Sequence, residues 1–332
     1  MKIALIGNKD FDTIEFHTAD ALRNLGHEVY HVDMSDFVNI RYLYNYWFSK
    51  FVPKYVDYMF NYLANKVIDF VPDLVIATYR FLPSISIQKI KRSLPHVPVV
   101  QLNPDALTTF EKQQVFYSPY DFFFTKDPYI VDFMRNKAGL NAYFLPEAFN
   151  DRFHRMPNID RITLEQKINI DVVAFGSIYP YRAGMLKKLV AAGLNLTIFG
   201  NNQNSDQELK KYFKDEWITG ERKSEILVGS KVVFNNFHYA EIESVNCKFF
   251  EIAGAGGFQI CDYKPAVEDF SGIASERFTF RKVDEAIDKI IYYLKQPEER
   301  YDMATKQRAH FLANHTYDIR IKQMLDIIFG KL

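Results

Sequence analysis

The chain opens with MKIALIGNKDFDTIEFHTADALRNLGHEVYHVD (residues 1–33), and this stretch decides the fold class. Residues 2–7 form a mostly apolar run that ends in glycine, which predicts a buried strand. A helical segment then ends at Gly26, and residues 28–32 form a second apolar run. Strand, helix and strand in this order make a βαβ unit, so we expect these two strands to lie parallel in one sheet.

The same alternation continues through the first half of the chain. Apolar runs recur at 74–77, 97–102 and 122–125, separated by helical or loop segments. We therefore predict a Rossmann-like domain over residues 1–155. The polar stretch 150–170 shows no periodicity, and we interpret it as a linker.

A second alternation follows the linker. Its expected elements are strands at 171–175, 195–199, 231–235 and 257–261 and helices at 181–192 and about 244–253, followed by terminal helices. This pattern predicts a second Rossmann-like domain over 156–315 and a terminal helical segment at 316–332. The fold class is therefore α/β, with two tandem doubly wound domains facing a cleft, and ligands are expected at the carboxyl ends of the strands.

Composition excludes several classes of protein. The 332 residues carry 41 Lys and Arg and 41 Asp and Glu, so the net charge of zero disfavours nucleic acid as a partner. Two cysteines are too few for a disulfide scaffold, and no leader or membrane-spanning run is evident, so a cytoplasmic location is expected. A hydrophobic content of 48% is that of a folded globular protein.

The glycines do not form a dinucleotide-binding fingerprint. The first strand is followed by a single glycine, Gly7, where three would be needed. The cluster of Gly254, Gly256 and Gly257 lacks the final glycine and precedes a strand, so we interpret it as a helix C-cap. An NAD-dependent oxidoreductase is therefore disfavoured.

The stretch EIESVNCKFFEIAGAGGFQICD (residues 241–262) carries the most chemical information. Ser244 is a good N-cap, so a helix is expected to begin there, with Val245 and Asn246 presenting free backbone N–H groups. Lys248, one turn along, would add positive charge suited to a diphosphate. Glu251 would lie on the same exposed face, where a carboxylate can accept hydrogen bonds from ribose hydroxyls. The alternative is an ordinary surface Lys–Glu ion pair.

A second set of residues lies in DVVAFGSIYPYR (residues 171–182). The strand ends at Gly176 and Ser177, where a backbone without a side chain allows close approach of a ligand. Arg182, just inside the next helix, could clamp phosphate oxygens. Gly200 ends the following strand in the same way. These residues are expected to bind the same nucleotide as the helix that carries Lys248.

At this point the chain resembles the GT-B glycosyltransferases, and within them the branch that is similar to the spore maturation protein CgeB (glycosyl transferases group 1). The resemblance is carried by FGSIYPYR, LTIFGN, SVNCKFFEIAGAGGFQICD and the tail YYLKQPEERYDMATKQRAHFLANHTYDIR. A fainter likeness to phage DNA β-glucosyltransferases appears in the same places and at Asn103-Pro104-Asp105.

The resemblance implies a nucleotide-sugar donor site in the second domain, an acceptor site in the first, and a last helix that crosses back onto the first. By position, Arg182 and Lys248 look like the cations that contact the diphosphate, and Glu251 looks like the acid that binds ribose. The family more often has Arg where Lys248 stands, which keeps the charge but changes its geometry. Glu243 and Glu251 match the E-x7-E spacing of many retaining relatives, without the usual glycine-rich sequence between them.

Sugar transfer needs positive charge on the leaving diphosphate, and Arg182, Lys248 and a helix N-terminus could supply it without a metal. No metal site and no separate cofactor are therefore expected. The first choice for a catalytic base is Asp105, whose other role would be to cap the segment after Pro104; His238 and Glu243 are second choices. The single Asp-x-Asp, at residues 10–12, is interpreted as turn chemistry or acceptor contact.

The expected donor is a UDP- or GDP-sugar, and the expected acceptor is a hydroxyl of a glycan, a protein or a small molecule. A sugar-nucleotide epimerase and a non-catalytic nucleotide-sugar-binding protein remain alternatives. The stretch RYLYNYWFSKFVPKYVDYMFNYLANK (residues 41–66) mixes aromatic and basic residues. It could contact a membrane surface or a sugar, or form a packed helix pair broken at Pro53.

Overall fold

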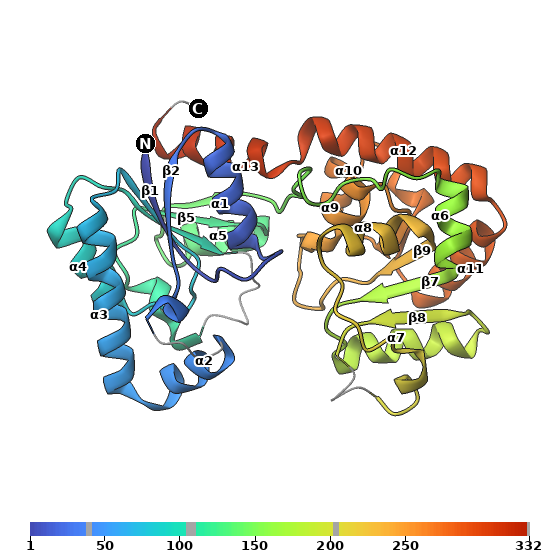
Figure 1. Ribbon diagram of the computed structural model, residues 1–332, viewed down its shortest axis with the longest axis horizontal. Helices are drawn as coiled ribbons and strands as arrows, with labels where there is room; N and C mark the ends of the chain where they lie inside the picture. Colours follow the sequence, from blue (N-terminus) through green and yellow to red (C-terminus); the bar gives the residue numbers. More distant parts are fainter. Residues whose placement is uncertain (38–41, 104–110, 202–205, 331–332) are drawn as a thin grey trace. The chain divides into compact units, whose positions relative to one another are not determined.

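The computed structural model describes residues 1–37, 42–103, 111–201 and 206–330. The chain divides into two compact units, each drawn in Figure 1. Unit 1 comprises Met1–Pro146 and Tyr317–Leu332, and unit 2 comprises Glu147–Thr316. The limits predicted from the sequence are residue 155 for the first domain and residue 315 for the second.

Unit 1 contains a parallel sheet with the strand order β2-β1-β3-β4-β5-β6. Its strands are β1 (Lys2–Ile6), β2 (Glu28–Val32), β3 (Leu74–Ala77), β4 (Val99–Asn103), β5 (Phe122–Thr125) and β6 (Ala142–Phe144). The central strands β1 and β3 are almost wholly apolar because helices cover both faces of a parallel sheet. The expected βαβ unit is present, with β1 and β2 paired in register from Lys2 and Glu28 onward.

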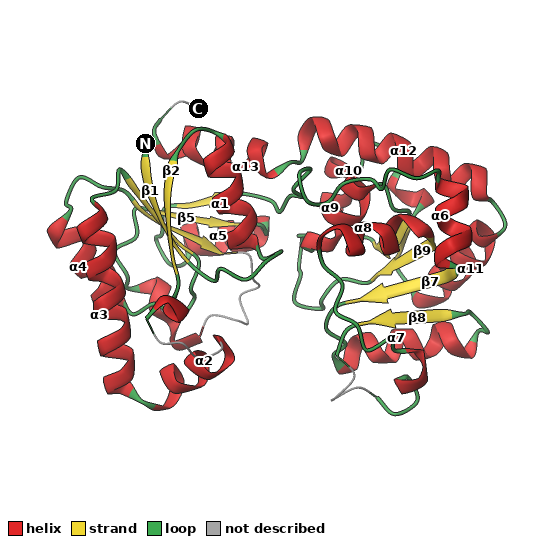
Figure 2. Cartoon of the chain, in the orientation of Figure 1, coloured by secondary structure: helices red, strands yellow, loops and turns green. Residues whose placement is uncertain are grey.

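The helices of unit 1 alternate with these strands, as Figure 2 shows. They are α1 (Ile14–Asn24), α2 (Tyr42–Phe51), α3 (Pro53–Phe70), α4 (Ser84–Ser93), α5 (Pro128–Asn136) and α13 (Tyr317–Ile328), with short 3-10 turns at Met34–Asp36 and Glu111–Phe116. The last helix, α13, packs against α1, and Asn24 Nδ2 donates to Asp318 Oδ2 over 2.6 Å. The expectation that the terminal helix returns to the first domain is confirmed.

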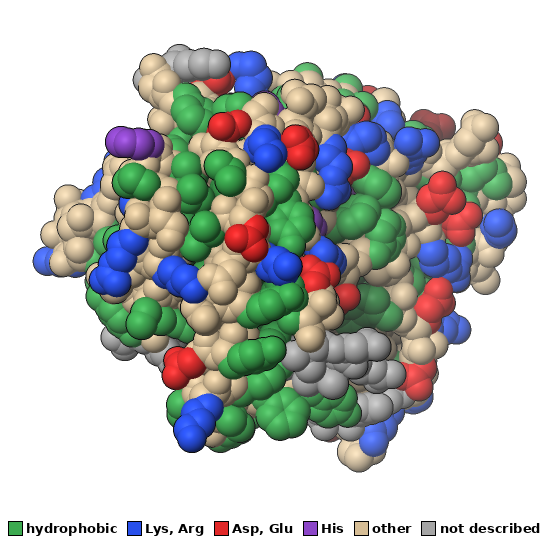
Figure 3. All heavy atoms as spheres, turned by 60° about the vertical axis from the view of Figure 1, so that its left-hand side comes forward, with side chains coloured by type: hydrophobic (Ala, Val, Ile, Leu, Met, Phe, Trp, Pro, Cys, Tyr) green, Lys and Arg blue, Asp and Glu red, His purple; other side chains and the backbone are tan. Residues whose placement is uncertain are grey.

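The aromatic stretch of unit 1 forms a helix pair. Pro53 occupies the first turn of α3 and separates it from α2. One face of α3 is buried, whereas Trp47, Phe48 and Phe51 are exposed, the last by 73%. Hydrophobic side chains, drawn in green, are also visible on the lower part of the surface in Figure 3. Membrane contact through this surface stays a prediction, and no described helix is both long and apolar enough to cross a bilayer.

Unit 2 contains a second parallel sheet, with the order β11-β10-β9-β7-β8. Its strands are β7 (Ile170–Phe175), β8 (Leu196–Phe199), β9 (Ser230–Asn235), β10 (Gln259–Asp262) and β11 (Thr279–Phe280). Its helices are α6 (Arg161–Ile168), α7 (Pro180–Ala191), α8 (Gly220–Gly229), α9 (Cys247–Ala255), α10 (Pro265–Phe270), α11 (Val283–Leu294) and α12 (Pro297–Asn314), with 3-10 turns at Lys210–Tyr212 and Ser275–Arg277. The prediction of two Rossmann-like α/β domains is confirmed.

The stretch interpreted as a linker contains a helix, so that interpretation is wrong for its second half. Asp160 caps α6 by accepting from the backbone N–H of Thr163. Leu164 is buried, and Glu165 accepts from both terminal nitrogens of the buried Arg300 at 3.0 Å each. One buried leucine in eight residues leaves no helical periodicity to detect, and the stabilising partner lies 135 residues away.

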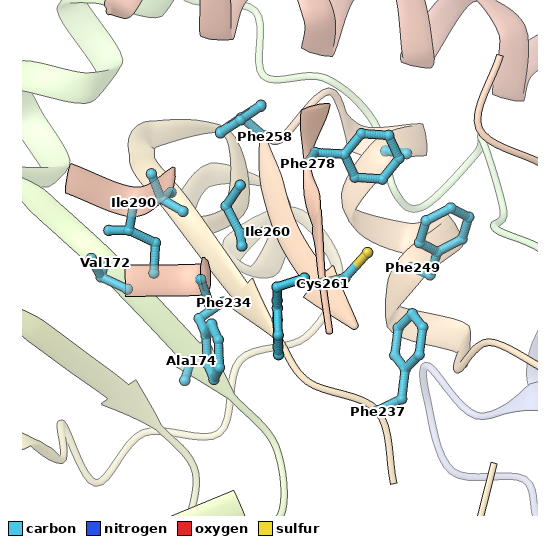
Figure 4. Close-up of a cluster of buried hydrophobic side chains, with 14 of the residues drawn as sticks. Val172, Ala174, Phe234, Phe237, Phe249, Phe258, Ile260, Cys261, Phe278 and Ile290 are labelled. Carbon is cyan, nitrogen blue, oxygen red and sulfur yellow. The ribbon is translucent and has the colours of Figure 1, made fainter. Parts of the chain in front are cut away.

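Aromatic side chains from several elements fill the core of unit 2, as Figure 4 shows. Phe234 of β9 stacks on Phe280 of β11, with ring centroids 5.6 Å apart. Phe249 of α9 is fully buried, and its ring centroid lies 6.3 Å from that of Phe237, which follows β9. These contacts anchor α9 to the carboxyl end of the sheet, and much of the chain's aromatic content therefore fills the core.

The glycine cluster after Ala253 ends α9. Gly256 adopts φ +97° and is the C-cap, as predicted, because the left-handed conformation is open to glycine at little cost. Gly254 has a different role. A Cβ placed on it would lie 2.3 Å from ring carbons of Phe149, which is fully buried. The absence of a side chain at Gly254 allows this close packing.

We expect Gly254→Ala to lower the free energy of unfolding by about 1–3 kcal/mol, because the added methyl group overlaps the Phe149 ring in a close-packed core. Gly184→Ala is the matched control, since Gly184 is exposed on α7 and its added Cβ meets open space. That variant should gain about 0.5–1 kcal/mol from reduced backbone entropy. Urea unfolding followed by circular dichroism measures both, and equal stabilities of the two variants would contradict this account.

Candidate functional site

The candidate site is built from residues of unit 2 alone. Two strands, β7 and β8, end at glycines that touch each other. Gly176 adopts φ +92° and Gly200 adopts φ +150°. A Cβ on Gly200 would lie 2.7 Å from the carbonyl oxygen of Gly176. Both glycines are thus required by the backbone, and they leave the end of the sheet without side chains at this point.

The helix that carries Lys248 begins later than predicted. Asn246, not Ser244, is the N-cap of α9, and its Oδ1 accepts from the backbone N–H of Phe249 over 3.0 Å. Ser244 is buried, and its hydroxyl donates to Glu241 Oε2 at 2.5 Å, so it does not cap the helix. Lys248 therefore lies in the first turn of α9, and the buried Val245 precedes the cap.

Three amide side chains hold the start of α9 against the sheet. Asn235 Nδ2 donates to Gln259 Oε1 over 2.9 Å, and Asn246 Nδ2 donates to Asn235 Oδ1 over 3.0 Å. Gln259 Nε2 then donates to the carbonyl oxygen of Phe249, also over 2.9 Å. Asn235 and Gln259 are buried, and a satisfied buried network of this kind specifies one geometry. Neither residue was predicted from the sequence to belong to the site, although Asn235 is a polar residue at the end of a strand.

Arg182 is 1% exposed and lies in the first turn of α7. Its NH1 donates to the carbonyl oxygens of Phe175 and Ser177, over 2.8 and 3.3 Å. Its Nε and NH2 have no hydrogen-bond partner in the part of the chain that is described. Burial lowers its pKa to about 10, so the guanidinium stays protonated at neutral pH. A buried cation with unpaired donors is costly unless an anion reaches it.

Lys248 lies beside the same strand end. A Cβ on Gly176 would lie 3.0 Å from Lys248 Nζ and 4.0 Å from Arg182 NH1, so the two cations flank this glycine. Lys248 is half-buried, and its Nζ lies 5.3 Å from the ring centroid of Phe175. Burial, followed by the positive charge of Arg182, lowers the pKa of the amine to about 7. The positive charges of Arg182 and Lys248 therefore lie close together in a poorly solvated environment.

Glu251 is buried rather than exposed, so the prediction that it shares an exposed face with Lys248 is wrong. It is 8% exposed, and its Oε2 pairs with Lys223 Nζ of α8 over 3.2 Å. Its Oε1 lies 3.9 Å from His154 Nε2, and His154 is itself buried. The surface Lys–Glu pair considered as the alternative is also absent, because α8 packs over this part of α9.

Two of the three candidates for the catalytic base lie among the described residues. Asp105 lies outside the described residues. Glu243 is half-buried in the loop before α9. His238 follows β9, and its Nδ1 accepts from the backbone N–H of Ala240 over 3.1 Å. In the neutral ring Nε2 then carries the proton, so His238 would donate a hydrogen bond rather than act as a base.

The Asp-x-Asp stretch of unit 1 is a turn. Asp12 adopts φ +69°, and its Oδ1 lies 3.0 Å from Nε2 of the buried His17. The Asp10 carboxylate accepts from Asn8 Nδ2 over 3.1 Å. The His17 ring also packs 5.2 Å from Tyr317 of α13. The His17 side chain thus packs within unit 1.

Two further residues of the site had no clear sequence signal. Asp262 ends β10, and its carboxylate accepts from the backbone N–H of Phe237. Burial raises the pKa of Asp262 to about 6. Tyr179 is the N-cap residue of α7, and burial raises its pKa to about 12. Both lie close enough to Arg182 for their charges to affect its pKa. The guanidinium therefore has one acidic neighbour, although no ion pair is formed between them among the described residues.

Comparison with known proteins agrees with this architecture. The model of a family described as "Glycosyl transferase-like" matches residues 182–326, which include Arg182, Lys248 and Glu251. No curated protein sequence matches the chain significantly. The fold is that of the GT-B glycosyltransferases, with two Rossmann-like domains. The family model matches less than half of the chain, and the structural neighbours, at 13% and 15% identity, show the fold.

Three solved structures illustrate the similarity. Sucrose-phosphate synthase from Thermosynechococcus elongatus aligns with a TM-score of 0.73 at 13% identity, covering 99% of this chain and 98% of that one. The lipopolysaccharide outer core galactosyltransferase WaaB aligns at 0.60 and 12% identity, covering 100% of both chains. The T4 phage β-glucosyltransferase, solved with UDP-glucose, aligns at 0.55 and 15% identity, covering 98% of this chain and 100% of that one.

We expect Lys223→Met to lower the free energy of unfolding by about 3–5 kcal/mol, because it leaves the Glu251 carboxylate buried without its ion pair. Adding Glu251→Gln to Lys223→Met should restore much of this loss, since the buried charge is then removed. Urea unfolding of the two single variants, the double variant and the parent chain measures the coupling. Additive effects of the two substitutions would show that the pair contributes little.

Proposed function

We propose that this chain transfers a sugar from a nucleoside diphosphate donor to a hydroxyl acceptor, and that unit 2 binds the donor. The observation that carries the proposal is the pair of cations, Arg182 and Lys248, at the glycine end of β7. Their positive charge lacks an acidic partner at hydrogen-bond distance within the described residues. A diphosphate would satisfy both cations.

The start of α9 adds to this charge. Its first N–H groups have no carbonyl partner within the helix, and the helix dipole places partial positive charge there. Lys248 projects from this first turn, and the amide network of Asn235, Asn246 and Gln259 fixes its position. Backbone donors, a helix dipole and two cations together make an anion site of the kind that binds phosphates.

In the proposed reaction, the same positive charge stabilises the leaving diphosphate as the bond to the anomeric carbon breaks. This is the role that a divalent cation would otherwise take, so the proposed transfer is independent of metal. The acceptor hydroxyl loses its proton to a carboxylate, for which Asp105 and Glu243 remain the candidates. His238 is better suited to donate a hydrogen bond to a sugar, because its Nδ1 is already occupied.

Glu251 is proposed to bind the ribose of the donor. Lys223 holds its carboxylate through an ion pair, and each carboxylate oxygen can accept more than one hydrogen bond. A UDP- or GDP-sugar is the proposed donor, and the UDP-glucose bound by the phage enzyme makes UDP the first nucleotide to test. Assignment to the CgeB-like branch remains part of the proposal.

We expect UDP or GDP to bind in the presence of EDTA, and Lys248→Met to weaken that binding about 10- to 100-fold, the loss of one charge-assisted hydrogen bond. Lys188→Met is the matched control, because Lys188 is exposed on α7, the helix of Arg182. Isothermal titration calorimetry measures the affinities. Absence of binding by UDP, GDP, TDP and CMP alike would overturn the proposal.

The two alternative functions, epimerisation and simple binding, can be distinguished from sugar transfer by the products that form. A sugar-nucleotide epimerase would isomerise a UDP-sugar without any acceptor, and a binding protein would neither hydrolyse nor transfer the sugar. Incubation with a nucleotide sugar and a panel of hydroxyl acceptors, followed by mass spectrometry and NMR of the products, distinguishes the three.

The affinity for UDP should fall as the pH rises above 7. Lys248 is half deprotonated at its pKa of about 7, and an anion binds only the protonated amine tightly. Each pH unit from about 7.5 to about 9 should weaken binding by up to tenfold until the pKa of the bound state is reached. In Lys248→Arg the side chain stays charged, so its affinity should change little over this range. Equal slopes for both proteins would exclude Lys248 as the titrating group.

A further inference from the structure

Four aromatic rings of unit 2 lie next to one another, and one of them, Tyr179, is close to Arg182. Tyr179 and Tyr181 belong to the start of α7, and His238 and Tyr239 belong to the loop after β9. We call these four residues the aromatic rim. The ring centroids of Tyr179 and His238 are 4.7 Å apart, those of His238 and Tyr239 are 4.2 Å apart, and those of Tyr181 and Tyr239 are 6.1 Å apart.

The rim is not part of the hydrophobic core. Tyr239 is 67% exposed and Tyr181 is 43% exposed, whereas Tyr179 and His238 are half-buried. Tyr179 and His238 meet edge to face, and His238 is tilted against Tyr239, which in turn meets Tyr181 edge to face. The four rings therefore form one row in which each ring contacts its neighbour. Exposed aromatic rings held by other rings offer an apolar surface at little entropic cost, because their side chains are already ordered.

The polar groups around the rim suit a sugar. Tyrosine hydroxyls can donate and accept, and the Nε2 of His238 is left free to donate because Nδ1 accepts from Ala240. Asp262 is the last residue of β10. Its carboxylate lies near enough to Tyr179 and Tyr181 to contribute to the rise in their pKa. A pyranose ring presents an apolar C–H face and a rim of hydroxyls, and it is matched by aromatic rings beside a carboxylate.

The position of the rim relative to Arg182 restricts the class of ligand that the rim could bind. Tyr179 caps the helix in which Arg182 occupies the first turn, and Arg182 NH1 donates to the carbonyl oxygen of Ser177, two residues before the cap. A sugar esterified to a diphosphate is joined directly to the second phosphate. A diphosphate held at Arg182 therefore brings its sugar within reach of these rings.

We infer that the aromatic rim of Tyr179, Tyr181, His238 and Tyr239 is a pyranose-binding surface of unit 2. The inference rests on the proposed function, because Arg182 is taken to hold the diphosphate. The pyranose is either the sugar of the donor or a sugar of the acceptor that approaches it, since both present the same face to the rings. The test has one arm for each source.

The variants Tyr181→Ala and Tyr239→Ala remove the two exposed rings, and Tyr239→Phe keeps the second ring without its hydroxyl. Tyr292→Ala is the matched control, because Tyr292 is a 51% exposed tyrosine of the same unit on α11. The first arm compares the affinities for UDP and UDP-glucose by calorimetry. The second arm measures binding of free maltohexaose, with and without UDP, by saturation-transfer NMR on the sugar protons.

We expect UDP affinity to stay within twofold of the parent in all variants. In the alanine variants the affinity for the sugar should fall about three- to tenfold, in the first arm for a donor sugar and in the second for an acceptor sugar. Tyr239→Phe should retain most of the affinity. An unchanged affinity for both UDP-glucose and maltohexaose, or an equal loss in Tyr292→Ala, would overturn the inference.

Failure of the proposed function gives a different result. If UDP does not bind the parent chain, the diphosphate assignment fails, and the maltohexaose arm still tests the rim. If UDP binds the parent chain, but the alanine variants bind UDP-glucose as tightly as the parent and no maltohexaose proton is saturated, the rim inference fails and the diphosphate assignment stands.

Discussion

The site depends on the buried amide network that holds the start of α9 against the sheet. Asn246 caps the helix with its Oδ1 and donates to Asn235 with its Nδ2, while Gln259 ties β10 to the backbone of α9. Each amide uses both its donor and its acceptor, so the network specifies where the helix begins. Lys248 lies in the first turn of that helix, and its approach to Gly176 follows from this position.

The position of α9 also brings two cations, Arg182 and Lys248, to the same glycine, Gly176. Arg182 is held by hydrogen bonds to the carbonyl oxygens of Phe175 and Ser177. Lys248 approaches Gly176 from a different element, α9. Neither cation forms an ion pair in the part of the chain that is described, so their mutual repulsion and poor solvation are retained in the folded chain. Packing elsewhere in unit 2 compensates for this cost, and sites with such uncompensated charge are typical of function.

Much of the architecture could be predicted because it is encoded locally. The apolar runs at β1, β7 and β9 are strands in the structure, and Gly256 ends α9 as its position in the sequence indicates. The errors share a cause. Ser244 and Asn246 are both good caps, and a distant partner, Asn235, accounts for the use of the second one. The helix α6 has little periodicity and is stabilised by Arg300, and the exposure of Glu251 was misjudged because α8 covers it.

The sequence by itself determined the order of strands and helices, the glycines at the strand ends, and the residue types that can bind a diphosphate. These features depend on φ preferences and on side chains within a few residues of each other. Only the tertiary structure decided that Glu251 pairs with Lys223, that His238 uses Nδ1 for Ala240, and that four aromatic rings of unit 2 lie next to one another. The physical reason is that burial and pairing depend on segments far apart in the chain, which meet only when both faces of the sheet are packed.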